Sequence, residues 1–254
     1  MSGASAVRLE SARLTAEGFR HGFATREGGV SEGTFASLSF AHGKEPEAAI
    51  EENLRRLAET VGFDPEALVE VSQVHGARVI EGQGDRQRLR REEADAVVVR
   101  GGAAAGVRIA DCVPVLVGDR ETGAAAAIHA GWRGIVAGVI SRGVNAMGGR
   151  GTDKVAAIGP CIGACCFEVG PDVARTIAAV VGDEGVITRS LGAKAFVDLR
   201  RAARARLLAA GLQGANVEDV QGCTRCDGAR FHSYRRDGEA SGRHLAVIVS
   251  RAIP

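Results

Sequence analysis

Val113-Pro-Val-Leu-Val-Gly-Asp-Arg-Glu-Thr-Gly-Ala-Ala-Ala-Ala-Ile-His-Ala130 is the stretch of sequence that decides the fold. It contains two apolar runs, 113–117 and 124–128, whose length and composition are typical of buried strands, and the turn-forming segment 118–123 joins them. A side chain able to bind a metal stands at an end of each run. Cys112 directly precedes the first run, and His129 follows the second. We therefore expect a rigid pair of strands that carries two potential ligands.

The rest of the chain mixes strand and helix patterns without a regular β-α-β alternation. Helical spacing of apolar residues and Gly or Pro boundaries predict helices over 46–61, 133–147, 171–181 and 199–210. Short apolar or β-rich runs predict strands over 19–25, 68–74, 78–80, 94–99, 106–109, 155–158, 216–220 and 245–249. This order favours an α+β fold with mixed β-sheets and flanking helices over a doubly wound sheet. No repeat or linker divides the chain, so residues 1–254 are predicted to form a single domain.

Composition excludes several classes of function. The formal net charge of +1 offers no general attraction for nucleic acid or for an anionic membrane. No apolar run reaches the roughly 18 residues of a membrane span, and the N-terminal residues lack the apolar core of a signal peptide. We expect a cytoplasmic protein that binds neither membrane nor nucleic acid. The six cysteines are then expected to be thiols or metal ligands.

His75, Cys112 and His129 form a candidate metal-ligand set. A lone buried Cys or His is usually structural. Two imidazoles and one thiolate nevertheless suit Zn²⁺, and three protein ligands leave a fourth position for water or substrate, as in catalytic zinc sites. The sequence thus indicates an open zinc site.

The segment Ala130-Gly-Trp-Arg133 suggests an anion site beside that metal. Backbone N–H groups at the start of the predicted helix, together with the Arg133 guanidinium, could hold phosphate. Asp111, next to Cys112, is a candidate for proton transfer. The alternative is that Arg133 is an ordinary charge on a helix surface.

Two further segments carry reactive side chains. Phe231-His-Ser-Tyr-Arg-Arg-Asp-Gly238 combines aromatic, hydroxyl and basic groups that suit a polar ligand with a flat ring, or else form a sheet edge. Cys223-Thr-Arg-Cys226 is half of a structural zinc site or a redox pair, and by spacing Cys165-Cys166 does not supply the other half. Cys161, Cys165 and Cys166 are expected to pack inside the protein or to line the cleft.

Six motifs in this order give the chain a family resemblance: Ser72-Gln-Val-His-Gly, Ala110-Asp-Cys-Val-Pro-Val-Leu, Ala130-Gly-Trp-Arg-Gly, Ile158-Gly-Pro-Cys-Ile-Gly, Cys165-Cys-Phe-Glu-Val-Gly, and Ser233-Tyr-Arg-Arg-Asp-Gly with Ser241-Gly-Arg. From about residue 22 to residue 248 the chain resembles the zinc-dependent purine nucleoside phosphorylases formerly described as multicopper polyphenol oxidoreductases or laccase-domain proteins.

The resemblance implies specific site residues. Our choice of Cys112, Asp111 and Arg133 as catalytic groups rests on their chemistry, whereas the resemblance places the metal ligands on His75, Cys112 and His129. It implies a substrate site that includes Arg26, Asn53, Gln73, Trp132 and Arg235. It also implies a sandwich-like fold similar to that of the toxin-type cysteine hydrolases. Lys44 departs from the family pattern, which often has Asp at this position, so the preference among purines is less well defined.

The activity implied is phosphorolysis of adenosine, inosine, guanosine or 5′-methylthioadenosine to the free base and ribose 1-phosphate, with adenosine deamination as a side activity. The cofactor would be Zn²⁺, copper could occupy the site adventitiously, and we expect a monomer. True laccase chemistry is excluded because it needs roughly ten histidines, commonly in His-x-His pairs, whereas this chain has six and no such pair. Two alternatives remain: a peptidoglycan-editing hydrolase of a UDP-linked cell-wall precursor with Cys112 as nucleophile and His129 as base, and a non-catalytic metal- or redox-responsive binding protein that uses Cys223 and Cys226.

Overall fold

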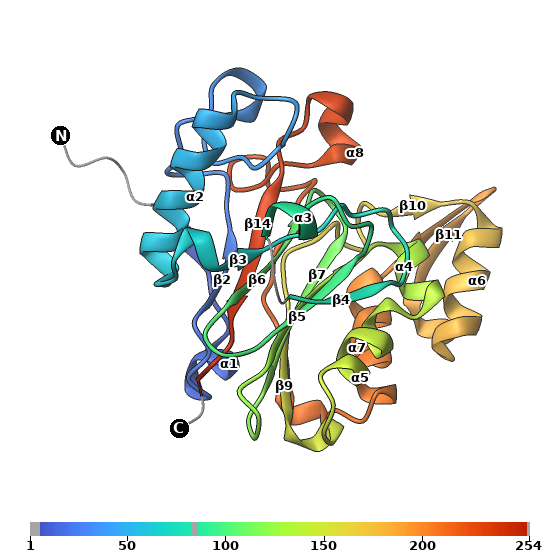
Figure 1. Cartoon of the computed structure of the whole chain (residues 1–254). Helices are drawn as coiled ribbons and strands as arrows, with labels where there is room; N and C mark the ends of the chain where they lie inside the picture. The colour runs from blue at the N-terminus through green and yellow to red at the C-terminus, as the bar shows by residue number, and fades with distance from the viewer. Residues whose placement is uncertain (1–5, 83–85, 253–254) are drawn as a thin grey trace.

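The computed structural model describes residues 6–82 and 86–252. Two sheets pack face to face, and helices cover both outer faces (Figure 1). The first sheet has the strand order β1 (Arg8–Leu9), β2 (His21–Ala24), β14 (His244–Val249), β6 (Ala104–Ile109), β3 (Leu68–Val69). The second has the order β13 (Val217–Asp219), β9 (Lys154–Ile158), β7 (Val113–Asp119), β8 (Ala125–Ala130), β5 (Ala96–Val99), β4 (Val79–Glu81). The predicted α+β class with mixed sheets is confirmed.

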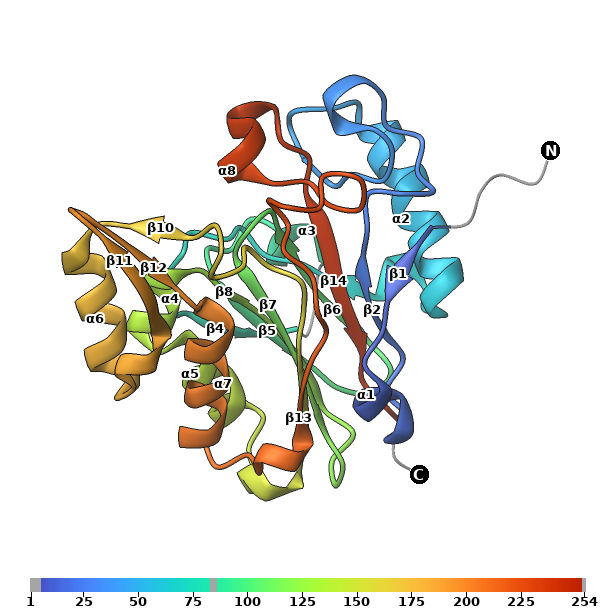
Figure 2. The same cartoon turned by 180° about the vertical axis from the view of Figure 1, so that it is seen from behind.

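Helices segregate to the two sides of this pair of sheets. α2 (Glu47–Val61) lies against the first sheet, and α4 (Trp132–Ala137), α5 (Val139–Ala146) and α7 (Leu199–Ala209) lie beside the second. α6 (Pro171–Val181) packs farther out, on α4 and α7, as Figure 2 shows from behind. Three short α-helices complete the α-helices of the described residues: α1 (Ala12–Ala16), α3 (Arg86–Leu89) and α8 (Tyr234–Asp237). A small third sheet has the order β10 (Glu168–Val169), β12 (Lys194–Val197), β11 (Ile187–Leu191).

Strand alternation assigns each side chain to one layer of the core. In β7, Leu116 packs between the two sheets, whereas Val115 and Val117 pack toward the helices. In β14, Ile248 packs between the sheets and Val247 packs toward α2. Successive side chains of a strand point to opposite faces, so a strand covered on both faces is apolar at nearly every position. The continuous apolar runs in the sequence follow from this double burial.

The expected pair of strands, β7 and β8, lies in the middle of the second sheet. They pair antiparallel, and His129 is the partner of Pro114. Cys112 therefore lies just before one strand and His129 near the end of the other, at the same edge of the sheet. Core strands thus hold two of the predicted ligands in a fixed geometry.

Three sequence predictions need correction. The helix predicted over 133–147 is two helices, because Gly138 adopts a left-handed conformation (φ 85°) that ends α4 and starts α5. The strand predicted over 68–74 ends at Val69. The hairpin of β11 and β12 was not predicted; the residues of β11 are largely exposed and carry no apolar alternation.

No helix in the described part of the chain combines the length and the apolar character needed to cross a bilayer.

Candidate functional site

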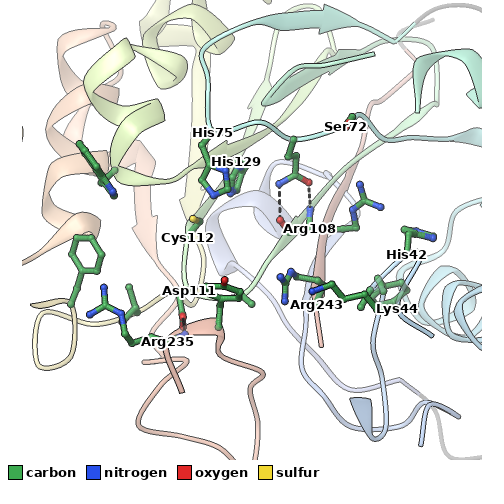
Figure 3. A pocket seen from close by; sticks show the side chains of 18 residues that line it. His42, Lys44, Ser72, His75, Arg108, Asp111, Cys112, His129, Arg235 and Arg243 are labelled. Atoms are coloured by element: carbon green, nitrogen blue, oxygen red, sulfur yellow. Dashed lines mark hydrogen bonds between the residues drawn. The ribbon is translucent and has the colours of Figure 1, made fainter. Parts of the chain in front are cut away.

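His75, Cys112 and His129 converge, although they are far apart in the sequence. His75 lies in the loop between β3 and β4, Cys112 directly before β7, and His129 in β8. Their donor atoms all lie within 4.8 Å of one another. The two imidazole rings meet edge to face with centroids 4.8 Å apart, and the Cys112 sulfur lies beside them (Figure 3). The three side chains form a candidate metal-binding site.

Gly131 makes room for this convergence. A Cβ atom at this position would lie 2.9 Å from Cys112 Sγ and 3.0 Å from His75 Cδ2, which is closer than packed atoms approach. Any larger residue would force the sulfur and the imidazole apart. The donors therefore share a space that the backbone leaves open for them.

Asp95 orients the donors from behind. It is fully buried, and its Oδ1 accepts hydrogen bonds from His129 Nδ1 at 2.7 Å and from the His75 backbone N–H at 2.9 Å. Its Oδ2 accepts from the backbone N–H groups of Gly76 at 2.6 Å and Val74 at 3.3 Å. Because Nδ1 of His129 donates its proton to Asp95, Nε2 is the nitrogen left for Cys112 or a metal, and it binds a metal after releasing its own proton. Asp95 thus fixes both the tautomer of one ligand and the backbone of another.

The backbone is strained at two points of the site. His75 has φ 61° and Asp111 has φ 91°, a region that side chains other than glycine rarely adopt. Asp95 holds the His75 amide in this conformation. Asp111 is held by Thr224, whose hydroxyl donates to Oδ1 at 2.6 Å, and by the Arg235 N–H, which donates to Oδ2 at 2.6 Å. Strain maintained by such contacts is characteristic of functional sites.

The electrostatics favour charged forms of the donors. Burial opposes ionisation, yet His129 and His75 lower the pKa of the Cys112 thiol below its ordinary value. Burial also opposes protonation of His129, but Cys112 and Asp95 raise its pKa. The pKa of Asp95 is held below its usual range by His129 and the loop amides, against the effect of burial. A thiolate stabilised in this way is the form that binds a metal or attacks an electrophile.

A cavity of about 670 Å³ opens onto the three donors. Four cationic side chains line it: Lys44, Arg108, Arg235 and Arg243. In the described residues of the lining, Asp111 is the one carboxylate, and both its oxygens already accept hydrogen bonds. Figure 3 shows Arg108 and Arg243 on one side of the cavity and Arg235 below Cys112. The lining therefore favours an anionic ligand.

Aromatic side chains supply the flat surfaces of the same cavity. Phe40, Trp132, Phe167 and Tyr234 line it. The Arg235 guanidinium lies 5.5 Å from the centre of the Phe167 ring, and the Arg243 guanidinium lies 5.5 Å from that of Tyr234. Alternating aromatic and cationic groups suit a ligand that has both a flat ring and an anionic group.

The structure places Arg133 outside this cavity. Its side chain is exposed and stacks on Trp132, with Cζ 4.5 Å from the ring centre. α4 begins at Trp132, so Arg133 is the second residue of the helix and faces outward. The alternative of a helix-surface charge describes its position better than the anion site expected from the sequence. Trp132 itself does line the cavity.

Arg26 and Asn53 also lie outside the lining and hold loops together. The Arg26 guanidinium donates to the backbone carbonyls of Ala36 and Gly228. Asn53 is fully buried and bonds to the Val30 N–H at 2.8 Å. Neither residue is among those that line the cavity, so their expected role in substrate binding stays a prediction.

Gln73 lines the cavity as expected, yet its amide is engaged. It accepts from the Arg108 N–H at 2.7 Å and donates to the Arg108 carbonyl at 2.7 Å. Arg235 also lines the cavity. The sequence reasoning missed Asp95, Arg108 and Arg243, although Arg243 stood in the motif Ser241-Gly-Arg and Arg108 lies just before Ala110-Asp-Cys.

Comparison with known proteins identifies the family. A sequence model of the multi-copper polyphenol oxidoreductase laccase family matches residues 20–251. The chain belongs to this family. It is 37% identical to a purine nucleoside phosphorylase of Pseudomonas aeruginosa, over 88% of this chain and 90% of that protein. It is 40% identical to an adenosine deaminase from an unknown prokaryotic organism, over 76% of this chain and 78% of that protein. The crystal structure of YlmD from Geobacillus stearothermophilus superimposes with a TM-score of 0.88 at 30% identity, and the match covers 99% of this chain and 98% of YlmD.

The family's description names several copper ions, but the described residues do not offer the histidine clusters with which a laccase binds them. Two groups of side chains among the described residues have metal-binding geometry, and they contain two histidines in all, His75 and His129. His21, His232 and His244 are buried and bonded to the backbone. Multicopper oxidation needs far more imidazole ligands at one place.

Proposed function

We propose that this laccase-family protein is a zinc-dependent purine nucleoside phosphorylase that also deaminates adenosine. The observation that carries the proposal is the cavity with cationic and aromatic walls that opens onto three convergent His and Cys donors. Its volume of about 670 Å³ accommodates a nucleoside and a phosphate side by side. Relatives at 37–38% identity are named for the first activity and one at 40% for the second.

The donor set suits zinc. Two imidazoles and one thiolate are common ligands of catalytic zinc, and they leave one position open. A zinc ion bound by His75, Cys112 and His129 would supply Lewis acidity at the floor of the cavity. Asp95 already holds the His129 ring and the His75 backbone in this structure, so the site is preorganised for the ion.

In phosphorolysis, a phosphate oxygen forms a bond to the anomeric carbon while the bond from that carbon to the purine nitrogen breaks. The electron pair leaves with the purine, which takes up a proton to become the free base. Arg108 and Arg243 lie on one side of the cavity, where they can bind phosphate through charge-assisted hydrogen bonds. Tyr234 and Trp132 offer ring faces against which the purine can stack. These residues hold the reactants together and spread the developing negative charge.

In deamination, the oxygen of water bonds to purine carbon 6 and the amino group leaves as ammonia. The product is inosine. This reaction needs no phosphate. The same aromatic walls would position the ring, so one cavity serves both reactions. Asp111 accepts one hydrogen bond on each oxygen, from Thr224 and Arg235, and these contacts suit it to position the adjacent Cys112.

The test is product analysis with adenosine, inosine, guanosine and 5′-methylthioadenosine, each with and without phosphate. Free base together with ribose 1-phosphate is expected only when phosphate is present, and inosine is expected from adenosine in both conditions. The Cys112→Ala variant is expected to lose both products. Unchanged nucleosides under all conditions would refute the proposal.

One observation supports a second candidate, a cysteine hydrolase of a nucleotide-linked cell-wall precursor. Cys112, His129 and Asp95 have the order of a nucleophile, its base and the carboxylate that orients the base. Such an enzyme would work without metal. Chelation followed by alkylation of Cys112 separates the two candidates. The hydrolase would keep its activity after chelation and lose it after alkylation. The phosphorylase would already be inactive after chelation.

A further inference from the structure

A second group of soft ligands lies outside the cavity. Cys165 and Cys166 lie in the turn after β9, and Cys223 and Cys226 lie in the turn after β13. The four sulfur atoms all lie within 4.8 Å of one another, and all four thiols are free. The sequence prediction that Cys165-Cys166 does not complete the Cys223–Cys226 pair is wrong, because the fold brings the two turns together despite their unusual spacing.

The distances between the sulfur atoms fit a metal and not a disulfide. Cys166 Sγ lies 3.2 Å from Cys226 Sγ, and Cys165 Sγ lies 3.5 Å from Cys226 Sγ and 3.7 Å from Cys223 Sγ. A disulfide would require about 2.05 Å. Four sulfurs placed tetrahedrally at the zinc–sulfur distance of about 2.3 Å are about 3.8 Å apart. These three separations are slightly shorter than those of a zinc tetrathiolate, and the others lie within 4.8 Å.

Backbone contacts hold the two turns in place. Cys161 and Cys223 form a β-bridge, and the Thr224 N–H donates to the Cys161 carbonyl at 3.0 Å. The Gly163 N–H donates to Cys223 Sγ at 3.2 Å, and the amides of Arg225 and Cys226 point at the same sulfur. N–H groups aimed at a sulfur favour its thiolate form. This arrangement prepares a ligand before the ion arrives.

Space and charge at the cluster also suit an ion. A Cβ atom at Gly163 would lie 3.2 Å from Cys165 Sγ and 3.3 Å from Cys223 Sγ, so a larger residue would push at least one sulfur out of its place. Four thiolates around Zn²⁺ leave two negative charges, and the Arg225 side chain interacts with Cys166 and lies close enough to compensate them. Cys165 and Cys226 are exposed, which gives an ion a path of entry.

We propose that Cys165, Cys166, Cys223 and Cys226 bind a structural zinc ion that joins the two turns behind the cavity. Four protein ligands close the coordination sphere, which distinguishes this site from the open one at Cys112. Binding replaces up to four thiol protons with one Zn²⁺ and releases those protons to the solvent; no oxidant or reductant is needed.

The proposed ion would stabilise the wall of the cavity. Thr224 lies between the two cysteines of one turn and donates to Asp111, which adjoins Cys112. Phe167 follows Cys166 and lines the cavity beside Arg235. Loss of the ion would therefore loosen both Asp111 and Phe167 and lower the unfolding temperature.

Metal analysis of the purified full-length protein tests this inference. We expect about two zinc ions per chain in the wild type, with one lost in Cys226→Ser and the other lost in Cys112→Ala. Cys161→Ala is the matched control, because this cysteine is fully buried beside the cluster but outside it, and it should keep both ions. After reconstitution with Co²⁺, the absorption of a tetrahedral tetrathiolate should persist in Cys112→Ala and vanish in Cys226→Ser.

Thiol protection provides a measurement that needs no variant. In zinc-loaded wild-type protein, the exposed Cys165 and Cys226 should resist maleimide, and a strong chelator should restore their reactivity. One zinc ion per chain together with rapid alkylation of both residues would overturn the inference. A Cys223–Cys226 disulfide found by mass spectrometry in freshly purified, zinc-replete protein would overturn it in favour of a redox pair.

Discussion

Replacing Asp95 with Asn should weaken metal binding at the open site, although none of the three proposed ligands is substituted. The wild-type carboxylate uses its two oxygens to accept from four N–H donors: His129 Nδ1 and the amides of Val74, His75 and Gly76. An Asn side chain has one oxygen, so its NH₂ group must face one of the two sets of donors. Neither orientation can satisfy both sets.

Each orientation carries a definite cost. If the NH₂ faces Gly76 and Val74, donor meets donor in a fully buried space, and the turn that holds His75 loses its anchor. If the NH₂ faces His129, it stabilises the tautomer with the proton on Nε2, which cannot bind a metal. Loss of a partner that orients a metal ligand typically costs about 10–100-fold in affinity. We expect this range for zinc, together with a stability loss of about 3 kcal/mol from the broken charged contact.

The assay is competition for zinc against a chelator of known affinity, with urea unfolding measured in parallel. Asp119→Asn is the matched control. Asp119 is as buried as Asp95, pairs with Lys154 at 3.0 Å and accepts from loop amides, but it lies at the far end of β7. It should lose stability and keep its zinc affinity. If Asp95→Asn bound zinc as tightly as the wild type, the orienting role of Asp95 would be refuted.

Three further substitutions have expected outcomes. Gly131→Ala should lower zinc affinity at least about tenfold in the same competition assay, because its methyl group would approach Cys112 Sγ to 2.9 Å; retained affinity would contradict this. Arg243→Gln should raise the KM for phosphate about tenfold with a smaller effect on kcat, because it removes a cation from the cavity lining. The control is Arg189→Gln, which removes an arginine stacked on an aromatic ring away from the cavity and should change neither constant. Burial lowers the pKa of His244 to about 3. Below about pH 6.5 this histidine is therefore protonated in the unfolded chain and neutral in the folded chain. Its contribution lowers the free energy of unfolding by about 1.4 kcal/mol for each unit by which the pH falls. His244→Gln should reduce this acid slope in urea unfolding between about pH 7 and about pH 5, and an unchanged slope would show that His244 titrates freely.

The layers of the core were predictable because double burial leaves a direct trace in the sequence. The runs that became β5, β7, β8 and β14 are apolar at nearly every position, and such runs are hard to place elsewhere. The hairpin of β11 and β12 lacks this trace because β11 is largely exposed. The break at Gly138 was also hidden, since glycine inside an apolar periodicity is compatible with both a continuous helix and a capped end.

The candidate ligand set was predictable from its chemistry, and the structure brings its three members together, but their surroundings were not predictable. Two imidazoles and one thiolate together, at His75, Cys112 and His129, suit zinc better than any one of them does alone. Asp95 is an ordinary carboxylate in the sequence, and its role depends on four donors that only the fold brings to it. The positions of Arg133, outside the cavity, and Arg243, in its lining, likewise depend on the fold. Which arginine faces the cavity depends on the direction of a side chain, and neither spacing nor composition records that direction.

β14 has a consequence for how the protein is made. It is the last strand of the chain, yet it lies in the middle of the first sheet and pairs with both β2 and β6. A nascent chain that still lacks β14 has two strands with unpaired edges and no ladder to join them. Contacts between distant parts of a sequence form late, and until they form the edges of the unpaired apolar strands stay exposed. We therefore expect the first sheet to complete only after residues 244–249 have been synthesised, and expect chains truncated before these residues to aggregate instead of yielding a smaller active enzyme.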